Sequence, residues 1–295
     1  MKQSLSYYIT IAVLKLKGIK KVFSNDPINY KKIRKEDVAV PKSSFYNKHI
    51  SRQFQIEKTS ITEIKTKQPK ETLVLFVHGG AFISGPAKHH WDAIKTIVKN
   101  TNCTIWMCNY PKAPEHNITE ISQNIDSVYK EALQTYTSDQ IILIGDSVGG
   151  TLITALTQRL IQEKKALPQK IMLICPVMDA TMENPKITAI DAFDPMLSKL
   201  GILSSKKMCA GKVPLNHEMI SPLNGDFTGF PKTILYVATN DIMYPDQLLV
   251  IKKMQDAAVD LEVIEGENMP HIWPLLPVMK EAKIALHSII EKIKE

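Results

Sequence analysis

The sequence predicts an α/β fold in which helices flank a mostly parallel central sheet. Short apolar runs bounded by turn residues alternate with stretches whose apolar residues recur at helical spacing. This alternation continues from about residue 72 to the C-terminus, and it is typical of parallel strands joined by crossover helices. A chain of 295 residues has room for one large α/β domain or two small ones.

The elements are predicted in chain order from these patterns. An antiparallel hairpin at residues 54–65 precedes the alternation. We expect strands at 72–77, 103–108, 141–144, 171–175, 233–239 and 261–265, and helices at 89–100, 118–136, 148–163, 245–258 and 278–293. Short helical pieces between prolines interrupt the rhythm and indicate an insertion. The predicted organisation is an N-terminal helical segment, residues 1–50, and a core, residues 51–295, with the insertion at about 180–225.

Composition narrows the classes of function. The net charge is +7, but the lysines are scattered and no nucleic-acid motif is present, so we expect no nucleic-acid partner. The four cysteines lack zinc spacing, and three of them lie in predicted strands or at strand ends. Buried thiols of this kind fit a reducing compartment, which predicts a cytoplasmic location.

The apolar N-terminal stretch faintly resembles a targeting or membrane segment. Apolar residues from Leu5 to Ile19 recur at helical spacing, but the stretch is too short to span a bilayer and no cleavage site follows it. We expect an amphipathic helix that packs on the protein's own body, without stable membrane insertion. Attachment to a membrane surface is the alternative.

The stretch Ile141–Gly150, IILIGDSVGG, is the centre of the functional prediction. An apolar strand runs into Gly145-Asp146-Ser147-Val148-Gly149, and a helical pattern begins at once. This G-x-S-x-G layout is typical of a nucleophile elbow, in which the serine hydroxyl is exposed between strand and helix. An ordinary serine helix cap is the alternative for these five residues alone.

Three other predicted strand ends carry groups that acyl transfer needs. His78-Gly79-Gly80-Ala81-Phe82 follows the strand at 72–77, Asp241 follows the strand at 233–239, and His271 follows the strand at 261–265. Functional groups of a parallel sheet gather at this edge. Ser147 would attack, His271 would move the proton, and Asp241 would hold the imidazole.

The backbone N–H groups of the glycine-rich turn and of Val148 would stabilise the oxyanion. The predicted oxyanion hole is Gly79, Gly80, Ala81 and Val148. The order Ser147, Asp241, His271 is the order expected in an α/β-hydrolase. Asp246 is the rival carboxylate, but Pro245 places it in the first turn of a predicted helix rather than directly at the strand end. His78 is expected to brace the turn, and His89-His90 to face solvent rather than hold a metal.

These motifs resemble the hormone-sensitive-lipase-like α/β-hydrolases, a family of microbial serine carboxylesterases. The turn at 78–82 is similar to the family's H-G-G-G-[FW] motif, residues 145–150 to G-D-S-A-G-G, and residues 110–115 to Y-R-L-A-P-E. The resemblance implies a helical cap built from residues 1–50 and 180–225. It departs from the family at Ala81, Val148, Asn240 and Ile272, none of which replaces a catalytic group.

The resulting hypothesis is a serine carboxylesterase that cleaves short-chain esters through an acyl-enzyme, with a small-molecule ester as partner and no metal or cofactor. Phe82 and Trp273 are expected either to wall the acyl pocket or to pack the cap. A deacetylase, amidase or thioesterase on the same triad, and a non-catalytic binding protein, are the alternatives. The sequence leaves homo-oligomer formation open.

Overall fold

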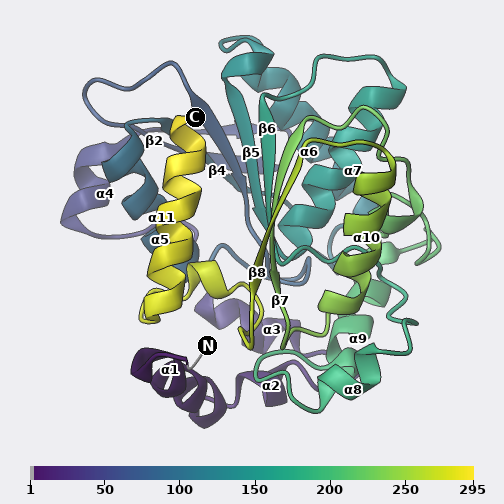
Figure 1. Ribbon diagram of the computed structural model, residues 1–295. Helices are drawn as coiled ribbons and strands as arrows, with labels where there is room; N and C mark the ends of the chain where they lie inside the picture. The colour runs from purple at the N-terminus through teal and green to yellow at the C-terminus, as the bar shows by residue number, and fades with distance from the viewer. Residues whose placement is uncertain (1–2) are drawn as a thin grey trace.

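The computed structural model describes residues 3–295 and contains an eight-stranded sheet flanked by helices (Figure 1). The strands are β1 Ile50–Ile56, β2 Thr59–Ile64, β3 Leu73–Val77, β4 Thr104–Asn109, β5 Ile141–Asp146, β6 Lys170–Ile174, β7 Lys232–Ala238 and β8 Leu261–Gly266. Their order in the sheet is β1-β2-β4-β3-β5-β6-β7-β8. The β1–β2 hairpin and the β2–β4 pair are antiparallel, and the six strands from β4 to β8 are parallel. The predicted mostly parallel sheet is confirmed.

Helices cover both faces of the sheet. They are α5 Lys88–Thr101, α6 Ile118–Ala132, α7 Val148–Gln162, α10 Tyr244–Asp256 and α11 Lys280–Lys294. Figure 1 shows α5 and α11 on one face and α6, α7 and α10 on the other. All residues of β3, β5 and β6 are therefore buried, as expected for central strands of a parallel sheet.

The predicted element bounds agree with the structure to within a few residues. The clearest difference is at α6, which ends at Ala132 rather than at Tyr136. The amides from Leu133 to Tyr136 bond back to carbonyls of the preceding turn without continuing the helix. All four cysteines are buried free thiols, which confirms the burial predicted for the three that lie in strands or at strand ends.

Shorter helices come from two distant parts of the chain. They are α1 Leu5–Leu16, α2 Ile19–Val22, α3 Tyr30–Ile33 and α4 Ser44–His49 before the sheet, and α8 Ile187–Asp191 and α9 Lys199–Ala210 within the predicted insertion. In Figure 1, α1, α2, α3, α8 and α9 gather at the end of the sheet where β7 and β8 finish. α4 lies apart from them and packs on α5, where the Tyr46 hydroxyl donates to the Trp91 carbonyl.

Residues 19–28 and α9 lie directly against each other. The Ile28 amide donates to Ser204 Oγ at 3.0 Å. A Cβ at Gly201 would collide with the Phe23 carbonyl, so glycine permits this helix to approach the N-terminal segment closely. The N-terminal segment and the insertion thus form one layer over the carboxyl ends of the strands.

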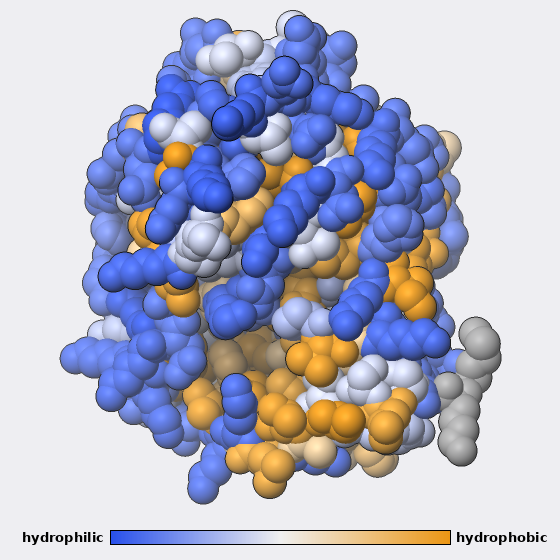
Figure 2. Space-filling model, turned by 90° about the vertical axis from the view of Figure 1, so that its left-hand side faces the viewer, coloured by the Kyte–Doolittle hydropathy of each residue, from blue (hydrophilic) through white to orange (hydrophobic). Residues whose placement is uncertain are grey.

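The prediction for α1 is only half right. The helix forms, and Tyr7 is buried against the body, but several apolar residues on another side of the helix face solvent. Figure 2 shows an apolar band along the lower rim of this face, where Figure 1 places α1. Within residues 3–295, no helix combines the length and apolarity that a membrane span requires.

Candidate active site

Ser147 lies in a sharp turn between β5 and α7. Its φ of 52° and ψ of −123° place a non-glycine residue in a strained conformation, which its amide holds by donating to the Ile174 carbonyl at 2.9 Å. A Cβ at Gly149 would collide with the Val77 carbonyl, so only glycine lets α7 start this close to β3. This geometry presents the serine at the carboxyl edge of the sheet, where the residue is 8% exposed.

Asp241 and His271 form a buried pair at the same edge. They follow β7 and β8, which are adjacent parallel strands, so both residues emerge side by side. His271 Nδ1 lies 2.7 Å from Asp241 Oδ2, and Asp241 Oδ1 accepts the Met243 amide at 2.9 Å. Burial lowers the pKa of His271, but the Asp241 carboxylate outweighs it and raises the pKa above its ordinary value. The rival Asp246 accepts instead from Asn184 Nδ2 at 2.8 Å.

The second ring nitrogen of His271 has no hydrogen-bond partner among the described residues. No residue among 3–295 forms a hydrogen bond to His271 Nε2 or to Ser147 Oγ. The structure therefore brings Asp241 and His271 into contact, and it places Ser147 at the same edge without a hydrogen bond to the imidazole. Such bonds are often long before substrate binds.

The turn after β3 packs against the serine elbow. Gly80 has a φ of 124°, and Ala81 and Phe82 have φ values of 55° and 64°, so this turn uses left-handed backbone at three successive residues. A Cβ at Gly79 would lie 2.9 Å from the Ser147 Cβ. The amides of Gly80, Ala81 and Val148 donate to no residue that the structure describes. These three amides are available to an oxyanion beside Ser147.

Gly79 is a correction to the predicted oxyanion hole. Its amide donates to Asp146 Oδ1 at 2.9 Å, so this N–H already has an acceptor inside the protein. The sequence could not show this, because any amide of a glycine-rich turn is a candidate donor until its partner is known. The bond instead fixes the turn to the elbow.

His78 braces the turn, as its sequence position predicts. Its ring stacks on Tyr110 at a centroid distance of 4.4 Å, and the Tyr110 hydroxyl donates to the His78 carbonyl at 2.7 Å. Its Nδ1 lies 2.6 Å from the Gly79 carbonyl. Burial lowers the pKa of His78 well below its ordinary value, so the ring is neutral and Nδ1–H donates.

His90 and Asp146 form a second buried pair that sequence reasoning missed. His90 Nε2 lies 3.2 Å from Asp146 Oδ1 and 3.3 Å from Oδ2, and His90 Nδ1 accepts the Ala87 amide at 2.9 Å. The expectation that His89-His90 faces solvent is therefore wrong for His90, which is buried. No spacing rule could have found the pair, because 56 residues separate its members.

The same contacts bear on metal binding. His89, His90 and Asp146 have ligand atoms within 4.8 Å of one another. However, His90 Nδ1 accepts a hydrogen bond, so the hydrogen of the neutral ring must be on Nε2, where it points to Asp146. A metal-binding histidine normally has the opposite arrangement, with the other ring nitrogen donating. The donor set fits a hydrogen-bonded brace better than a metal site.

Asp194 is another buried carboxylate that the sequence did not single out. One oxygen accepts the amides of Met196 and Leu197, and the other accepts the Ile242 amide at 3.0 Å. Burial and the nearby Asp241 carboxylate raise the pKa of Asp194. Asp194 thus anchors the loop between α8 and α9 to the loop that carries Asp241.

The two predicted pocket residues have different surroundings. Phe82 is fully buried, and Lys206 Nζ of α9 lies 4.6 Å from its ring centroid. Lys206 is itself fully buried, its Nζ has no hydrogen-bond partner among the described residues, and burial lowers its pKa to about 7. Trp273 donates from Nε1 to the Val237 carbonyl at 3.1 Å, which fixes it against β7 rather than the helical layer.

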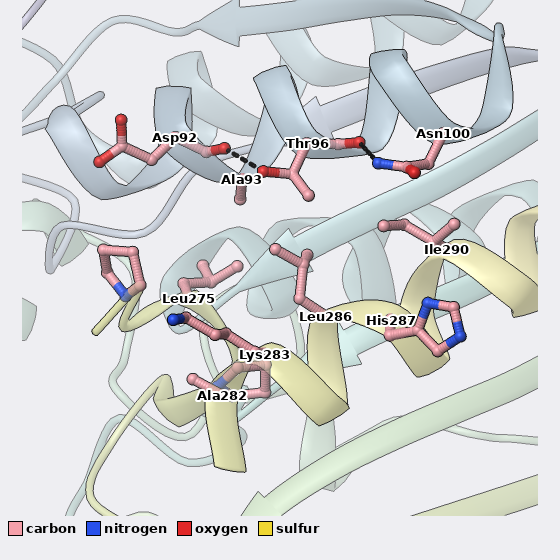
Figure 3. Close-up of a pocket in the computed structure, with 12 residues that line it drawn as sticks. Asp92, Ala93, Thr96, Asn100, Leu275, Ala282, Lys283, Leu286, His287 and Ile290 are labelled. Carbon is pink, nitrogen blue, oxygen red and sulfur yellow. Dashed lines mark hydrogen bonds between the residues drawn. The ribbon is translucent and has the colours of Figure 1, made fainter. Parts of the chain in front are cut away.

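A groove between two helices lies away from the candidate catalytic residues. This groove of about 400 Å³ lies between α5 and α11 and is lined by Thr96, Leu275, Lys283, Leu286, His287 and Ile290 among others (Figure 3). It contains none of Ser147, Asp241 and His271. The groove is therefore separate from the strand edge where Ser147, Asp241 and His271 lie.

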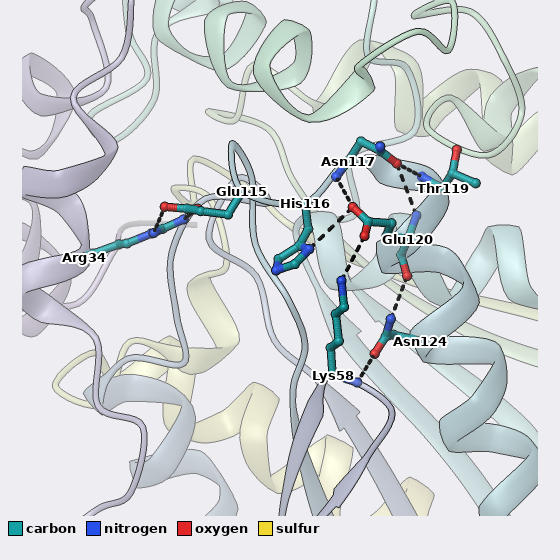
Figure 4. A network of polar contacts seen from close by, with 8 residues as sticks. All are labelled: Arg34, Lys58, Glu115, His116, Asn117, Thr119, Glu120 and Asn124. Carbon is teal, nitrogen blue, oxygen red and sulfur yellow. Dashed lines mark hydrogen bonds and ion pairs between the residues drawn. The ribbon is translucent and has the colours of Figure 1, made fainter.

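The segment Tyr110–Glu115 connects the site to the N-terminal helices (Figure 4). Arg34, directly after α3, donates to both Glu115 carboxylate oxygens at 2.9 and 2.7 Å. The same guanidinium donates at 2.6 Å to the carbonyls of Ile83 and Ala113. His116 pairs with Glu120 at 3.4 Å. One arginine therefore fixes three parts of the chain beneath the helical layer.

The chain is similar to known proteins in sequence and in fold. A family profile described as alpha/beta hydrolase fold matches residues 74–275. An esterase from Acinetobacter venetianus is 29% identical over 232 residues, which cover 78% of this chain and 77% of that protein. An acetyl-hydrolase from Streptomyces hygroscopicus is 25% identical over 222 residues, 73% of this chain and 74% of that protein. An esterase structure from the bacterial hormone-sensitive lipase family has a TM-score of 0.86 at 22% identity, covering 100% of this chain and 99% of that one.

Proposed function

The chain belongs to the alpha/beta hydrolase fold family, and from that premise we propose that it is a carboxylic ester hydrolase with Ser147 as its nucleophile. The observation that carries the proposal is the buried Asp241–His271 pair, whose second ring nitrogen is free at the edge where Ser147 emerges. A hydroxyl becomes a competent nucleophile when a neighbouring base takes its proton. Similarity to an esterase and an acetyl-hydrolase supports ester hydrolysis.

The proposed reaction has two halves. His271 Nε2 takes the Ser147 hydroxyl proton while Oγ bonds to the ester carbonyl carbon, and the bond to the alcohol oxygen then breaks as His271 returns the proton to it. Water repeats the sequence on the acyl-enzyme and releases the acid. Asp241 stabilises the imidazolium through the 2.7 Å contact to Nδ1. These steps need only the chain's own groups.

The proposed oxyanion hole is formed by the amides of Gly80, Ala81 and Val148. None of them donates to another described residue, and the Gly79–Asp146 bond holds the turn against the elbow. Each well-placed donor lowers the barrier by about 3 kcal/mol in enzymes of this type. Backbone donors survive the Ala81 and Val148 departures from the family motifs, since these replacements change side chains only.

Residues 1–50 and 180–225 are proposed to form the cap, with α4 set apart. The bonds from Ile28 to Ser204 and from Asp194 to Ile242 support this division, because they connect the two segments to each other and to the Asp241 loop. Such a layer, together with the nearly buried Ser147, favours short acyl chains. The four free thiols favour the cytoplasm as the location.

The test is hydrolysis of p-nitrophenyl acetate, butyrate, octanoate and palmitate by the wild-type protein and by Ser147→Ala. We expect the highest kcat/KM on the two short esters and no turnover above background in the variant. Turnover that persists in Ser147→Ala contradicts the assigned nucleophile. Absence of turnover on every ester favours the alternatives of an amide or thioester substrate, an acetylated substrate, or binding without chemistry.

A further inference from the structure

The exposed side of α1 is unusual for a helix of a globular protein. Tyr7, Ile11 and Leu14 face the body of the protein. Four apolar residues on another side remain exposed, namely Leu5 (76%), Ile9 (50%), Val13 (42%) and Leu16 (87%). Their spacing places them in one stripe along the helix. The helix is therefore apolar on two sides, and residues 3–295 leave one of these sides exposed.

Hydrogen bonds to the body of the protein hold α1 in place. The Tyr7 hydroxyl donates to the Asn268 carbonyl at 2.9 Å, and Ser4 Oγ donates to a Glu281 carboxylate oxygen at 2.8 Å. Ser6 Oγ accepts the Lys280 amide at 2.9 Å. The apolar stripe consequently has a fixed position at the rim of the molecule. Figure 2 shows apolar surface, interrupted by hydrophilic side chains, along that rim.

The charged residues of the N-terminal segment itself have one sign, although the Glu281 carboxylate contacts its first turn at Ser4. Residues 1–25 contain no Asp or Glu, whereas lysines follow the stripe at positions 15, 17, 20 and 21. Lys20 pairs with Asp191, but Lys15, Lys17 and Lys21 are exposed. A second copy of this chain would bring these cations together, in a protein whose net charge is already +7. An anionic lipid surface satisfies both the apolar stripe and the lysines.

We propose that the exposed stripe of α1 docks on an anionic lipid surface, with Leu5, Ile9, Val13 and Leu16 in the acyl–headgroup boundary and Lys15, Lys17 and Lys21 at the headgroups. This is interfacial binding by a helix that lies in the membrane plane. It differs from spanning, for which the helix of 12 residues is too short.

Docking would also place the active site at the interface, a consequence that rests on the proposed function. Asn268, which α1 holds, is in the loop that carries His271, and α1 lies at the carboxyl end of the strands (Figure 1). Esters dissolved in the outer layer of the membrane would then be close to Ser147. Esters free in water would not depend on α1.

The test is co-sedimentation with vesicles of phosphatidylcholine mixed with phosphatidylglycerol, compared with vesicles of phosphatidylcholine alone. The variants are Ile9→Gln/Val13→Gln for the stripe and Lys15→Gln/Lys17→Gln/Lys21→Gln for the charge. The matched control is Leu249→Gln, which changes an apolar residue of similar exposure (48%) on the distant helix α10. Circular dichroism and hydrolysis of p-nitrophenyl acetate in water report folding and the serine site separately.

We expect the wild-type protein and Leu249→Gln to bind the anionic vesicles, and the stripe variant to bind at least about tenfold more weakly. The triple lysine variant should lose the preference for anionic over neutral vesicles, and added salt should weaken wild-type binding. All variants should hydrolyse the soluble acetate ester at the wild-type rate. If the protein lacks esterase activity but these binding differences persist, the docking proposal stands without the proposed function.

Two results would overturn the docking proposal. One is wild-type binding to anionic vesicles that is absent or equal to that of the stripe variant. The other is a concentration-dependent dimer in sedimentation velocity that Ile9→Gln/Val13→Gln abolishes, which would assign the stripe to a second copy of the chain.

Discussion

Two buried histidine–carboxylate pairs lie beside Ser147, and they differ in what the ring nitrogens contact. In His271–Asp241 the carboxylate contacts Nδ1, and Nε2 has no partner in the described chain. In His90–Asp146 the carboxylate contacts Nε2, and Nδ1 accepts the Ala87 amide. Burial and a carboxylate partner are thus common to both pairs. Only the first leaves a ring nitrogen without a partner among the described residues, and this supports His271 as the proposed base.

The largest expected difference between the two pairs is the loss of activity when each imidazole is removed. His271→Gln should lower kcat/KM for p-nitrophenyl acetate by about 10³-fold or more, because no other group takes the serine proton. His90→Gln should stay within about tenfold of wild type, since its ring supports Asp146 and contacts no substrate. The measurement is kcat/KM by steady-state kinetics, on variants that circular dichroism shows to be folded. Equal losses in the two variants would contradict the assigned difference.

The carboxylate of the first pair should set the pH dependence. His271 acts only when neutral, so activity falls as pH drops below its pKa, which Asp241 raises above 6.5 against the effect of burial. Asp241→Asn should lower kcat/KM by about 10²–10⁴-fold and move the acidic limb of the residual activity to lower pH. Asp246→Asn is the control and should keep the wild-type profile. If the acidic limb of the pH–activity profile does not move in Asp241→Asn, Asp241 does not set the pKa of the catalytic base.

The second pair should matter for stability. His90→Gln removes one member of a buried pair and should lower the free energy of unfolding by about 3 kcal/mol at pH 7 in urea titrations. Burial raises the pKa of Asp146, but His90 and the Gly79 amide outweigh it and lower the pKa from 3.8 to about 2. The stabilisation is therefore complete above about pH 4 and is lost toward pH 2. A variant as stable as wild type would contradict the bracing role.

Lys206 differs from both pairs, because its buried ammonium lies beside the Phe82 ring and has no hydrogen-bond partner among residues 3–295. Burial lowers its pKa from 10.5 to about 7, so the unfolded chain binds the extra proton between these values. Wild-type stability should rise as pH increases from 7 to 10.5. Lys206→Met should be more stable by about 2 kcal/mol at pH 7, with the difference vanishing near pH 10.5. Thermal unfolding of both proteins from pH 7 to 10.5 measures this difference. A Lys206→Met variant that is less stable than wild type at pH 7 would contradict the prediction.

The features that could be predicted from the sequence are those that depend on the local pattern of residues. Strand and helix positions follow from periodicity, and the order of Ser147, Asp241 and His271 follows from reading each strand end in turn. The contact between Asp241 and His271 was predictable because parallel neighbouring strands end at one edge. The choice against Asp246 followed from Pro245, which places Asp246 inside the helix.

The sequence could not predict contacts that depend on how distant segments pack. The Gly79 amide is bound to Asp146 rather than to an oxyanion, and His90 turns inward, because α5 starts beside the elbow. Nor could periodicity show that α1 is covered on one side only, since apolar residues have the same pattern whether or not a neighbour meets them.

The most direct test of the account is labelling with a fluorophosphonate, followed by intact mass and peptide mapping. The account predicts one adduct per chain, on Ser147, formed in parallel with the loss of ester hydrolysis and formed much more slowly in His271→Gln than in His90→Gln. An adduct on another residue that accompanies loss of activity, or hydrolysis that continues in a fully labelled protein, would contradict it.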